Sequence, residues 1–203
     1  MTSKNKASET RNAKVSRKQQ ILQALAEMLE QTPGGRVTTA GLAKQVGVSE
    51  AALYRHFPSK AKMFDGLIEF IEETIFSRIN IILADNNTTE SRCRNTLHLL
   101  LTFTERNPGI TRILTGDPLS GESDRLRVRV AQFFDRFETQ LRQMLRESEL
   151  RDGSILKVET KIAANLMLAI VEGRISQFVR SDFSRKPTEN WDDQWQAIHR
   201  AIF

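Results

Sequence analysis

The chain has 203 residues, of which 39% are hydrophobic and 27% are charged, as in an ordinary folded protein rather than a disordered one. No apolar run approaches the roughly 20 residues that span a bilayer, and the N-terminal residues lack the apolar segment of a secretory signal. We therefore expect a cytoplasmic protein without a membrane contact. A single cysteine, Cys93, excludes an internal disulfide and is a poor metal ligand without companions.

The charge is distributed unevenly along the chain. Residues 1–62 hold 11 Lys or Arg against 4 Asp or Glu, a charge of +7, whereas the remainder holds 19 against 21, a charge of −2. A basic head on a near-neutral body favours a polyanionic partner, because cations release counterions from phosphates. A merely solvated basic tail would give the same count. Residues 1–15 are polar and basic without apolar periodicity, which predicts a disordered arm.

Apolar residues recur at helical spacing through most of the chain, and no strand alternation of any length occurs. Ser16 is a candidate N-cap for the first helix, and Pro33, Gly34 and Gly35 end it. We therefore predict an all-α fold whose later helices cover residues 39–46, 49–57, 60–84, 89–106, 108–115, 123–150, 156–181 and 189–203.

The segment LAKQVGVSEAALYRHF, residues 42–57, has the pattern of a helix-turn-helix. Ala43 allows the two helices to cross closely, Gly47 permits the tight turn, and Leu53 fills the small core between them. The second helix would then present its N-terminal end to the major groove of DNA. An ordinary helical hairpin within a bundle is the alternative, and the basic head argues against it.

Nine residues of this head are candidates for DNA contacts. Small side chains at the start of the second helix let the backbone approach base edges, and the aromatic and basic side chains suit phosphates. The threonines before the first helix of the pair have hydroxyl and amide groups that can face a phosphate. The candidates are Arg17, Thr38, Thr39, Ser49, Ala51, Ala52, Tyr54, His56 and Lys60.

The head, ending in LYRHFPSK and leading into a long fourth helix, resembles the TetR family of bacterial regulators. Further segments, including LIEFIE, ERNPG, TRILTG and FVRS, resemble the nucleoid occlusion factors of that family over about residues 18–183. The resemblance implies a homodimer that binds palindromic chromosomal DNA, with one or several dimers per DNA site. It further implies that the DNA-bound, nucleoid-associated protein captures the C-terminal tail of the division protein FtsZ and disrupts its polymers, with no cofactor.

The resemblance also implies a set of FtsZ-binding positions, namely Phe70, Arg78, Leu99, Arg106 and Asn107. Phe70 lies off the core stripe of its helix, so a groove between residues 60–84 and 89–106 could hold an apolar peptide, with arginine pairing its acids. Simple packing is the alternative for Phe70 and Leu99. We expect glycines where this chain has Thr102 and Thr104, so bulk at these two positions could narrow the groove.

Two other functions have some basis in the sequence. Phe133, Phe134 and Phe137 could line an inducer pocket, as in a ligand-responsive TetR-type repressor, but aromatic residues at helical spacing are more often core. Asp192 and Asp193 lack a converging histidine or nucleophile, so we do not expect an enzyme.

The expected organisation is a DNA-binding domain at residues 16–62 and a dimerisation and partner-binding domain at residues 63–203. The dimer seam is expected on the helices at 156–181 and 189–203, because Gly173 and Ser176 permit close helix packing.

Overall fold

A computed structural model describes residues 16–32, 35–85, 87–119, 124–153 and 155–203. The expected disordered arm at residues 1–15 lies outside the described residues. The regular elements of the described part are all helical, which confirms the predicted all-α class. They are α1 (Arg17–Gln31), α2 (Thr39–Val46), α3 (Glu50–His56), α4 (Lys60–Ala84), α5 (Thr89–Arg106), α6 (Pro108–Leu114), a 3-10 turn η1 (Asp117–Leu119), α7 (Asp124–Arg146), α8 (Ser148–Asp152), α9 (Thr160–Arg180) and α10 (Trp191–Ile202).

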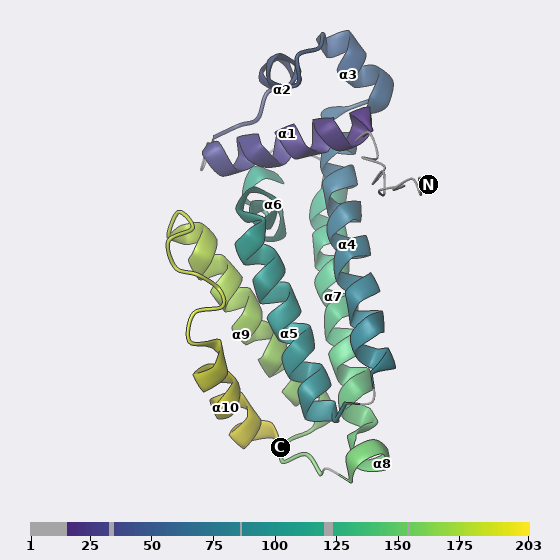
Figure 1. The fold of residues 1–203 in the computed structure, drawn as a ribbon, viewed down its shortest axis with the longest axis vertical. Helices are drawn as coiled ribbons and strands as arrows, with labels where there is room; N and C mark the ends of the chain where they lie inside the picture. Colours follow the sequence, from purple (N-terminus) through teal and green to yellow (C-terminus); the bar gives the residue numbers. More distant parts are fainter. Residues whose placement is uncertain (1–15, 33–34, 86, 120–123, 154) are drawn as a thin grey trace, which may run out of the picture.

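The helices form a small head at one end of an elongated body (Figure 1). α1 lies across the top of the body, with α2 and α3 beyond it, and α4 runs from the head along the length of the body. α5, α7 and α9 complete the body, while α10 packs on its outside and α6 lies directly beneath α1. Because α4 is continuous from Lys60, the boundary expected at residue 62 falls within a helix.

Polar side chains fix where the helices of the head begin. The Ser16 hydroxyl oxygen accepts a hydrogen bond from the backbone N–H of Gln19, and the Gln19 side-chain oxygen accepts one from the backbone N–H of Ser16, so that the two form a capping box. Thr38, Ser49 and Ser59 cap α2, α3 and α4 in the same way with their hydroxyl oxygens. Each such cap satisfies a backbone donor that the helix itself cannot, which is why the predicted starts of these helices are correct.

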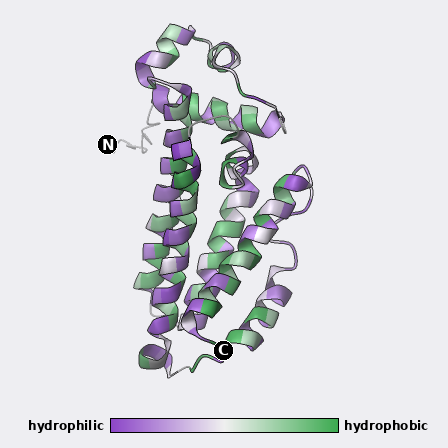
Figure 2. Ribbon diagram, turned by 180° about the vertical axis from the view of Figure 1, so that it is seen from behind, coloured by the Kyte–Doolittle hydropathy of each residue, from purple (hydrophilic) through white to green (hydrophobic). Residues whose placement is uncertain are grey.

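Apolar residues are concentrated along the faces of the long helices that meet inside the body (Figure 2). Phe133 and Phe137 of α7 are fully buried, and the Phe133 ring lies 5.5 Å from that of Phe76 on α4. Phe134 is half-buried and packs edge-on against Phe133. Ring-on-ring packing of this kind makes the three phenylalanines part of the core and not the lining of an inducer pocket, in agreement with the interpretation of their helical spacing.

Two helix boundaries in the C-terminal half differ from the prediction. The helix expected over residues 123–150 is divided into α7 and α8, and Asp152 at the end of α8 accepts a 2.5 Å hydrogen bond from the backbone N–H of Thr89. α9 begins at Thr160 instead of residue 156, because the backbone N–H of Lys157 bonds to the carbonyl oxygen of Ile202 at 2.8 Å. The second difference arises from a contact between segments distant in sequence, which local periodicity does not contain.

α9 also corrects the expectation that no segment has the length and apolar character of a membrane span. Among the described residues it is the one helix that meets both criteria. Its buried face packs between α5 and α7, with Met167, Val171 and Ile175 in the core. α9 thus contributes one apolar face to the core, while further apolar residues of the helix, including Ile162 and Leu166, are exposed.

Candidate DNA interface and partner groove

The helix-turn-helix has the geometry that its sequence requires. Gly47 ends α2 in the left-handed conformation, with φ of 74°, a backbone region that residues with a Cβ seldom adopt. Its N–H and that of Val48 return to the last carbonyls of α2, so the chain reverses into α3 within three residues. Leu42, Ala43 and Leu53 are buried beneath the turn and join the head to the core of α1.

The nine candidate DNA-contacting residues are all at least partly accessible on the head. Arg17, Thr38, Ser49, Ala51 and Tyr54 are exposed, and the other four, Thr39, Ala52, His56 and Lys60, are half-buried. The hydroxyl oxygens of Thr38 and Ser49 each accept a backbone N–H at 3.1 and 3.2 Å. These two hydroxyl groups therefore retain their protons as donors for a phosphate oxygen.

One of the two threonines differs from the expectation. The Thr39 hydroxyl donates to Glu50 at 2.7 Å, which links the starts of α2 and α3, so its proton is not free in this structure. Lys44 and Arg55 of the helix-turn-helix are also exposed cations, although they were not among the nine predicted candidates. Their positive charge was the one feature of the sequence that could have indicated them.

The end of α1 is fixed to the body by two residues of α6. A Cβ atom on Gly109 would lie 2.0 Å from the carbonyl oxygen of Ala26, so only glycine allows α6 to approach this closely. The buried guanidinium of Arg112 donates to the carbonyl oxygens of Leu29 and Thr32 at 2.6 and 2.7 Å, and pairs with Asp117. These carbonyls end α1 and carry the negative end of its dipole, which a cation neutralises.

A second connection joins the start of α4 to α7. Asp65 is buried between Lys62, at 2.8 Å, and Arg129 of α7, at 2.9 Å, and Arg129 also pairs with Glu72. Burial works to raise the pKa of Asp65, but hydrogen bonds from Lys62 and Arg129 outweigh it and hold that pKa below its usual range. The carboxylate therefore stays ionised and holds the α4 N-terminus, next to Lys60, against the body.

A groove with a volume of about 470 Å3 lies where the head meets the body. Its floor is apolar and includes Leu67 and Phe70 of α4, and Phe70 is 43% exposed, high for so large an apolar residue. Arg106, Asn107, Gly109 and Ile110, at the junction of α5 and α6, form one wall. α1 forms the other wall with Gln19, Leu22, Gln23, Ala26, Glu27 and Glu30.

The structure brings together three of the five residues expected to bind FtsZ. Phe70, Arg106 and Asn107 line this groove, and the Phe70 ring lies 6.3 Å from that of Phe103. Leu99 is half-buried on α5, and Arg78 is exposed on α4, about 12 Å along the helix axis from Phe70 at 1.5 Å per residue. These two do not line the groove, although they lie on the two helices that continue from it.

Neither Thr102 nor Thr104 is part of the groove lining. Thr104 is fully buried and donates to the carbonyl oxygen of Leu101 at 2.9 Å, so it faces the interior. The Thr102 hydroxyl lies 3.5 Å from a ring nitrogen of His98. The bulk at these two positions therefore lies outside this groove, which differs from the expected groove between α4 and α5 in having α1 as one wall.

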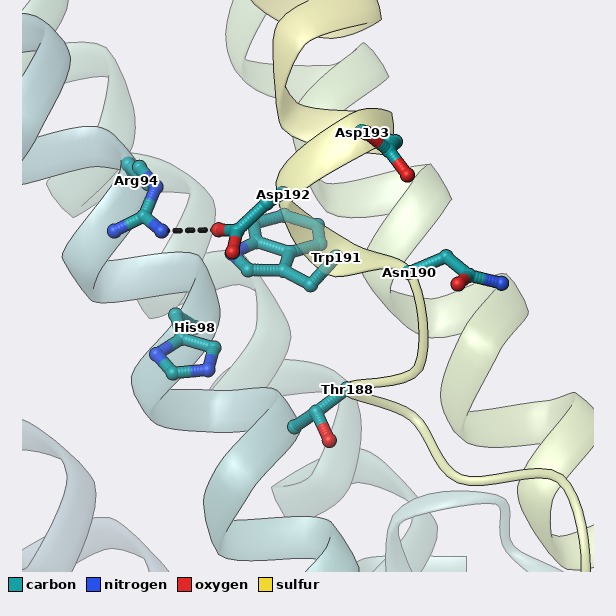
Figure 3. A pocket seen from close by; sticks show the side chains of 7 residues that line it. All are labelled: Arg94, His98, Thr188, Asn190, Trp191, Asp192 and Asp193. Carbon is teal, nitrogen blue, oxygen red and sulfur yellow. Dashed lines mark hydrogen bonds and ion pairs between the residues drawn. The ribbon is translucent and has the colours of Figure 1, made fainter.

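A polar hollow between α5 and α10 contains Asp192 and Asp193, the two adjacent aspartates of α10 (Figure 3). Asp192 points to Arg94 and forms an ion pair with it, whereas Asp193 points away from Asp192. The ring of His98 stacks on Trp191 at 6.5 Å, and burial, assisted by Arg94, lowers the pKa of His98. The carboxylates do not converge, and the described residues contain no cluster of three or more metal-ligating side chains.

Comparison with known proteins assigns both parts of the chain. Residues 21–67 match the family of bacterial regulatory proteins of the tetR type, and residues 87–202 match the SlmA-like C-terminal domain of tetracyclin repressor-like proteins. The nucleoid occlusion factor SlmA of Alteromonas mediterranea is 61% identical over 93% of this chain and 97% of its own length. That of Shewanella oneidensis is 59% identical over 93% of this chain and 96% of its own.

The fold is shared with more distant regulators. The Bacillus subtilis transcriptional regulator FadR, solved with stearoyl-CoA, superposes with a TM-score of 0.71 over 91% of this chain and 98% of its own, at 16% identity. This likeness concerns the fold alone. Matches to both family models, together with relatives at about 60% identity over nearly the whole length, establish that the chain belongs to the TetR family of regulatory proteins and, within it, to the nucleoid occlusion factors SlmA.

Proposed function

We propose that the protein is a nucleoid occlusion factor whose DNA-bound homodimer captures the C-terminal tail of FtsZ and antagonises FtsZ polymerisation. In this role it binds palindromic chromosomal sites in the cytoplasm and blocks assembly of the division septum over the nucleoid. The observation that carries the proposal is the 61% identity to a nucleoid occlusion factor over 93% of the chain. Membership of a DNA-binding regulatory family also confirms the prediction that the chain is not an enzyme.

The groove at the head–body junction supports the FtsZ part of the proposal. It combines an apolar floor around Phe70 with an exposed cation, Arg106, on its rim. A short peptide with apolar side chains and an acidic residue is the chemistry that such a surface binds. Arg78 and Leu99 lie outside this groove, farther along α4 and α5, so a contact with them requires a peptide longer than the groove.

A ligand-responsive repressor is the second candidate, because the fold is shared with FadR, which was solved with stearoyl-CoA. The place for an inducer would be the interior of the body. Phe133 and Phe137 are packed there ring against ring with Phe76. This packing favours the nucleoid occlusion factor over the ligand-responsive repressor.

A two-fold DNA site requires two heads, and we place the dimer seam on α7 and α9. The two helices pack side by side, and their outward faces carry Val128, Ile162 and Leu166, each at least 41% exposed. Gly173 continues this surface, with no atom near the position of a Cβ. The sequence pointed to residues 156–181 and 189–203, but α10, in the second range, buries its tryptophans, Trp191 and Trp195, within its own chain.

Thr38→Ala should weaken binding to specific DNA about tenfold or more. The substitution removes the α2 N-cap, at about 1 kcal/mol, and a hydroxyl that would donate to a phosphate, at about 1.5–3 kcal/mol. Thr38→Ser keeps both groups and should bind nearly as wild type does. Fluorescence anisotropy over a range of salt concentrations measures the DNA affinity. The logarithm of the association constant should fall with the logarithm of the salt concentration by about 0.9 for each phosphate contacted. Equal affinity of wild type and Thr38→Ala would remove Thr38 from the interface.

Arg106→Glu should reduce affinity for the FtsZ C-terminal peptide by about thirtyfold, or roughly 2 kcal/mol, while leaving DNA affinity unchanged. The substitution replaces a cation that pairs with an acidic residue of the peptide by a repelling anion. Arg106 ends α5, outside the helix-turn-helix, so the DNA contacts are unaffected. Anisotropy of labelled peptide at saturating specific DNA measures the loss.

Arg146→Glu makes the same change of charge at an exposed position on α7 and serves as the matched control. Thermal melting of both variants separates a lost contact from lost structure. A normally folded Arg106→Glu protein that binds the peptide as wild type does would place the FtsZ site elsewhere. If wild type itself does not bind FtsZ, the ligand-responsive repressor becomes the better assignment.

A further inference from the structure

The partner groove has two walls, and they carry opposite charge. The body supplies Arg106, whereas α1, which belongs to the DNA-binding head, supplies Glu27 and Glu30. Between them lies an apolar floor that includes Leu67 and Phe70 of α4. A helix assigned to DNA binding therefore contributes half of the surface that a partner peptide would meet.

Some charged side chains of the two walls have hydrogen-bond partners within the chain, and others do not. Glu27 accepts hydrogen bonds from Gln23 at 3.2 Å and Gln45 at 3.1 Å. Within the described residues, neither the exposed carboxylate of Glu30 nor the exposed guanidinium of Arg106 has a hydrogen bond or ion pair. Both groups are thus available to an incoming ligand, one for a cation and the other for an anion.

The two walls are also fixed relative to each other. The close approach of Gly109 to the backbone of Ala26 and the bonds from Arg112 to the end of α1 hold the helix against the junction of α5 and α6. Glu30 lies within this contact, because its backbone nitrogen would be 2.9 Å from a Cβ on Gly109. The backbone of α1 that carries the two glutamates is therefore preorganised, which lowers the entropic cost of binding a ligand there.

We propose that α1 is a specificity wall of the partner groove, and that Glu30, supported by Glu27, selects a peptide with a basic residue beside its apolar segment. The inference rests on the proposed capture of the FtsZ tail and adds to it a second charge contact of opposite sign. The occupant that fits is a short peptide whose acidic residue meets Arg106, whose apolar residues cover Phe70, and whose basic residue meets Glu30.

The test measures binding of the labelled FtsZ C-terminal peptide to full-length protein at saturating specific DNA, so that changes in DNA affinity do not enter. Glu30→Lys should weaken the peptide about tenfold at low salt, and Glu30→Gln by about threefold, because an accessible ion pair contributes modestly and repulsion adds to its loss. Asp193→Lys, the same charge reversal on α10, should leave affinity unchanged. The loss should shrink as salt rises.

A charge exchange distinguishes a direct contact from an indirect effect on folding. A second peptide carries glutamate in place of each lysine or arginine of the first. It should bind wild type more weakly than the unmodified peptide does. It should bind Glu30→Lys at least threefold more tightly than the unmodified peptide does. If wild type and Glu30→Lys bind the peptide equally well, the proposed role of Glu30 is wrong, whereas the proposed capture of FtsZ is unaffected. A wild type that does not bind the peptide at all would overturn both. Loss of binding in Glu30→Lys without any rescue by the exchanged peptide would also overturn the direct contact.

Discussion

Arg112→Met should lower the free energy of unfolding by about 3 kcal/mol, the range found when one partner of a buried ion pair is removed. Methionine fills a similar volume but donates no hydrogen bond. The substitution removes the Arg112 donor from the carbonyl oxygens of Leu29 and Thr32, although the Thr32 oxygen still accepts the backbone N–H of Gly35 at 3.1 Å. It also leaves Asp117 without the guanidinium that it pairs with. The cost is large because Arg112 is only 1% exposed, so water does not replace the lost donor.

Urea denaturation measures this change, and a lower melting temperature by about 6–12 °C should accompany it for a chain of this size. Arg127→Met is the matched control, because it makes the same substitution at an arginine whose side chain is 60% exposed, and it should cost little. We also expect weaker DNA binding by Arg112→Met, because α1 supports the helix-turn-helix. An unchanged unfolding midpoint would mean that desolvation of the guanidinium cancels its bonds, and the junction would then depend on Gly109 and apolar contacts alone.

Leu166→Glu should convert the dimer into a monomer and reduce affinity for a palindromic site by about a hundredfold or more. The side chain is 41% exposed on the proposed seam, beside Ile162 on the same face of α9. In the dimer a carboxylate there would lie in an apolar contact, where an unpaired charge is strongly disfavoured. A palindrome needs two recognition helices about 34 Å apart, and a monomer supplies one. Sedimentation equilibrium gives the mass and anisotropy gives the DNA affinity.

Ile155→Glu is the control for this experiment. Ile155 is more exposed than Leu166 but precedes α9, outside the proposed seam, so the same change of residue type should leave the dimer intact. A dimeric, DNA-binding Leu166→Glu protein would move the seam away from α9, with the outward face of α10 as the next surface to test.

Local sequence determined the elements of the head almost completely. Ser16, Thr38 and Ser49 begin helices because their hydroxyls cap free backbone donors, and Gly47 ends α2 because it adopts a positive φ readily. The physical causes of these boundaries lie within four residues of the boundary, so the sequence alone contains them. The same holds for the bounds of α4, where Ser59 precedes a long amphipathic pattern.

Only the tertiary structure decided what these helices do together. The groove depends on α1 lying across α6, which requires Gly109 to meet the backbone of Ala26, 83 residues earlier. The role of Glu30 as part of a wall, the distance of Arg78 from the groove lining, and the inward direction of Thr104 follow from that arrangement. Periodicity shows which face of a helix is apolar but not which other helix covers it, because packing is fixed by shape and contacts between residues far apart in the chain.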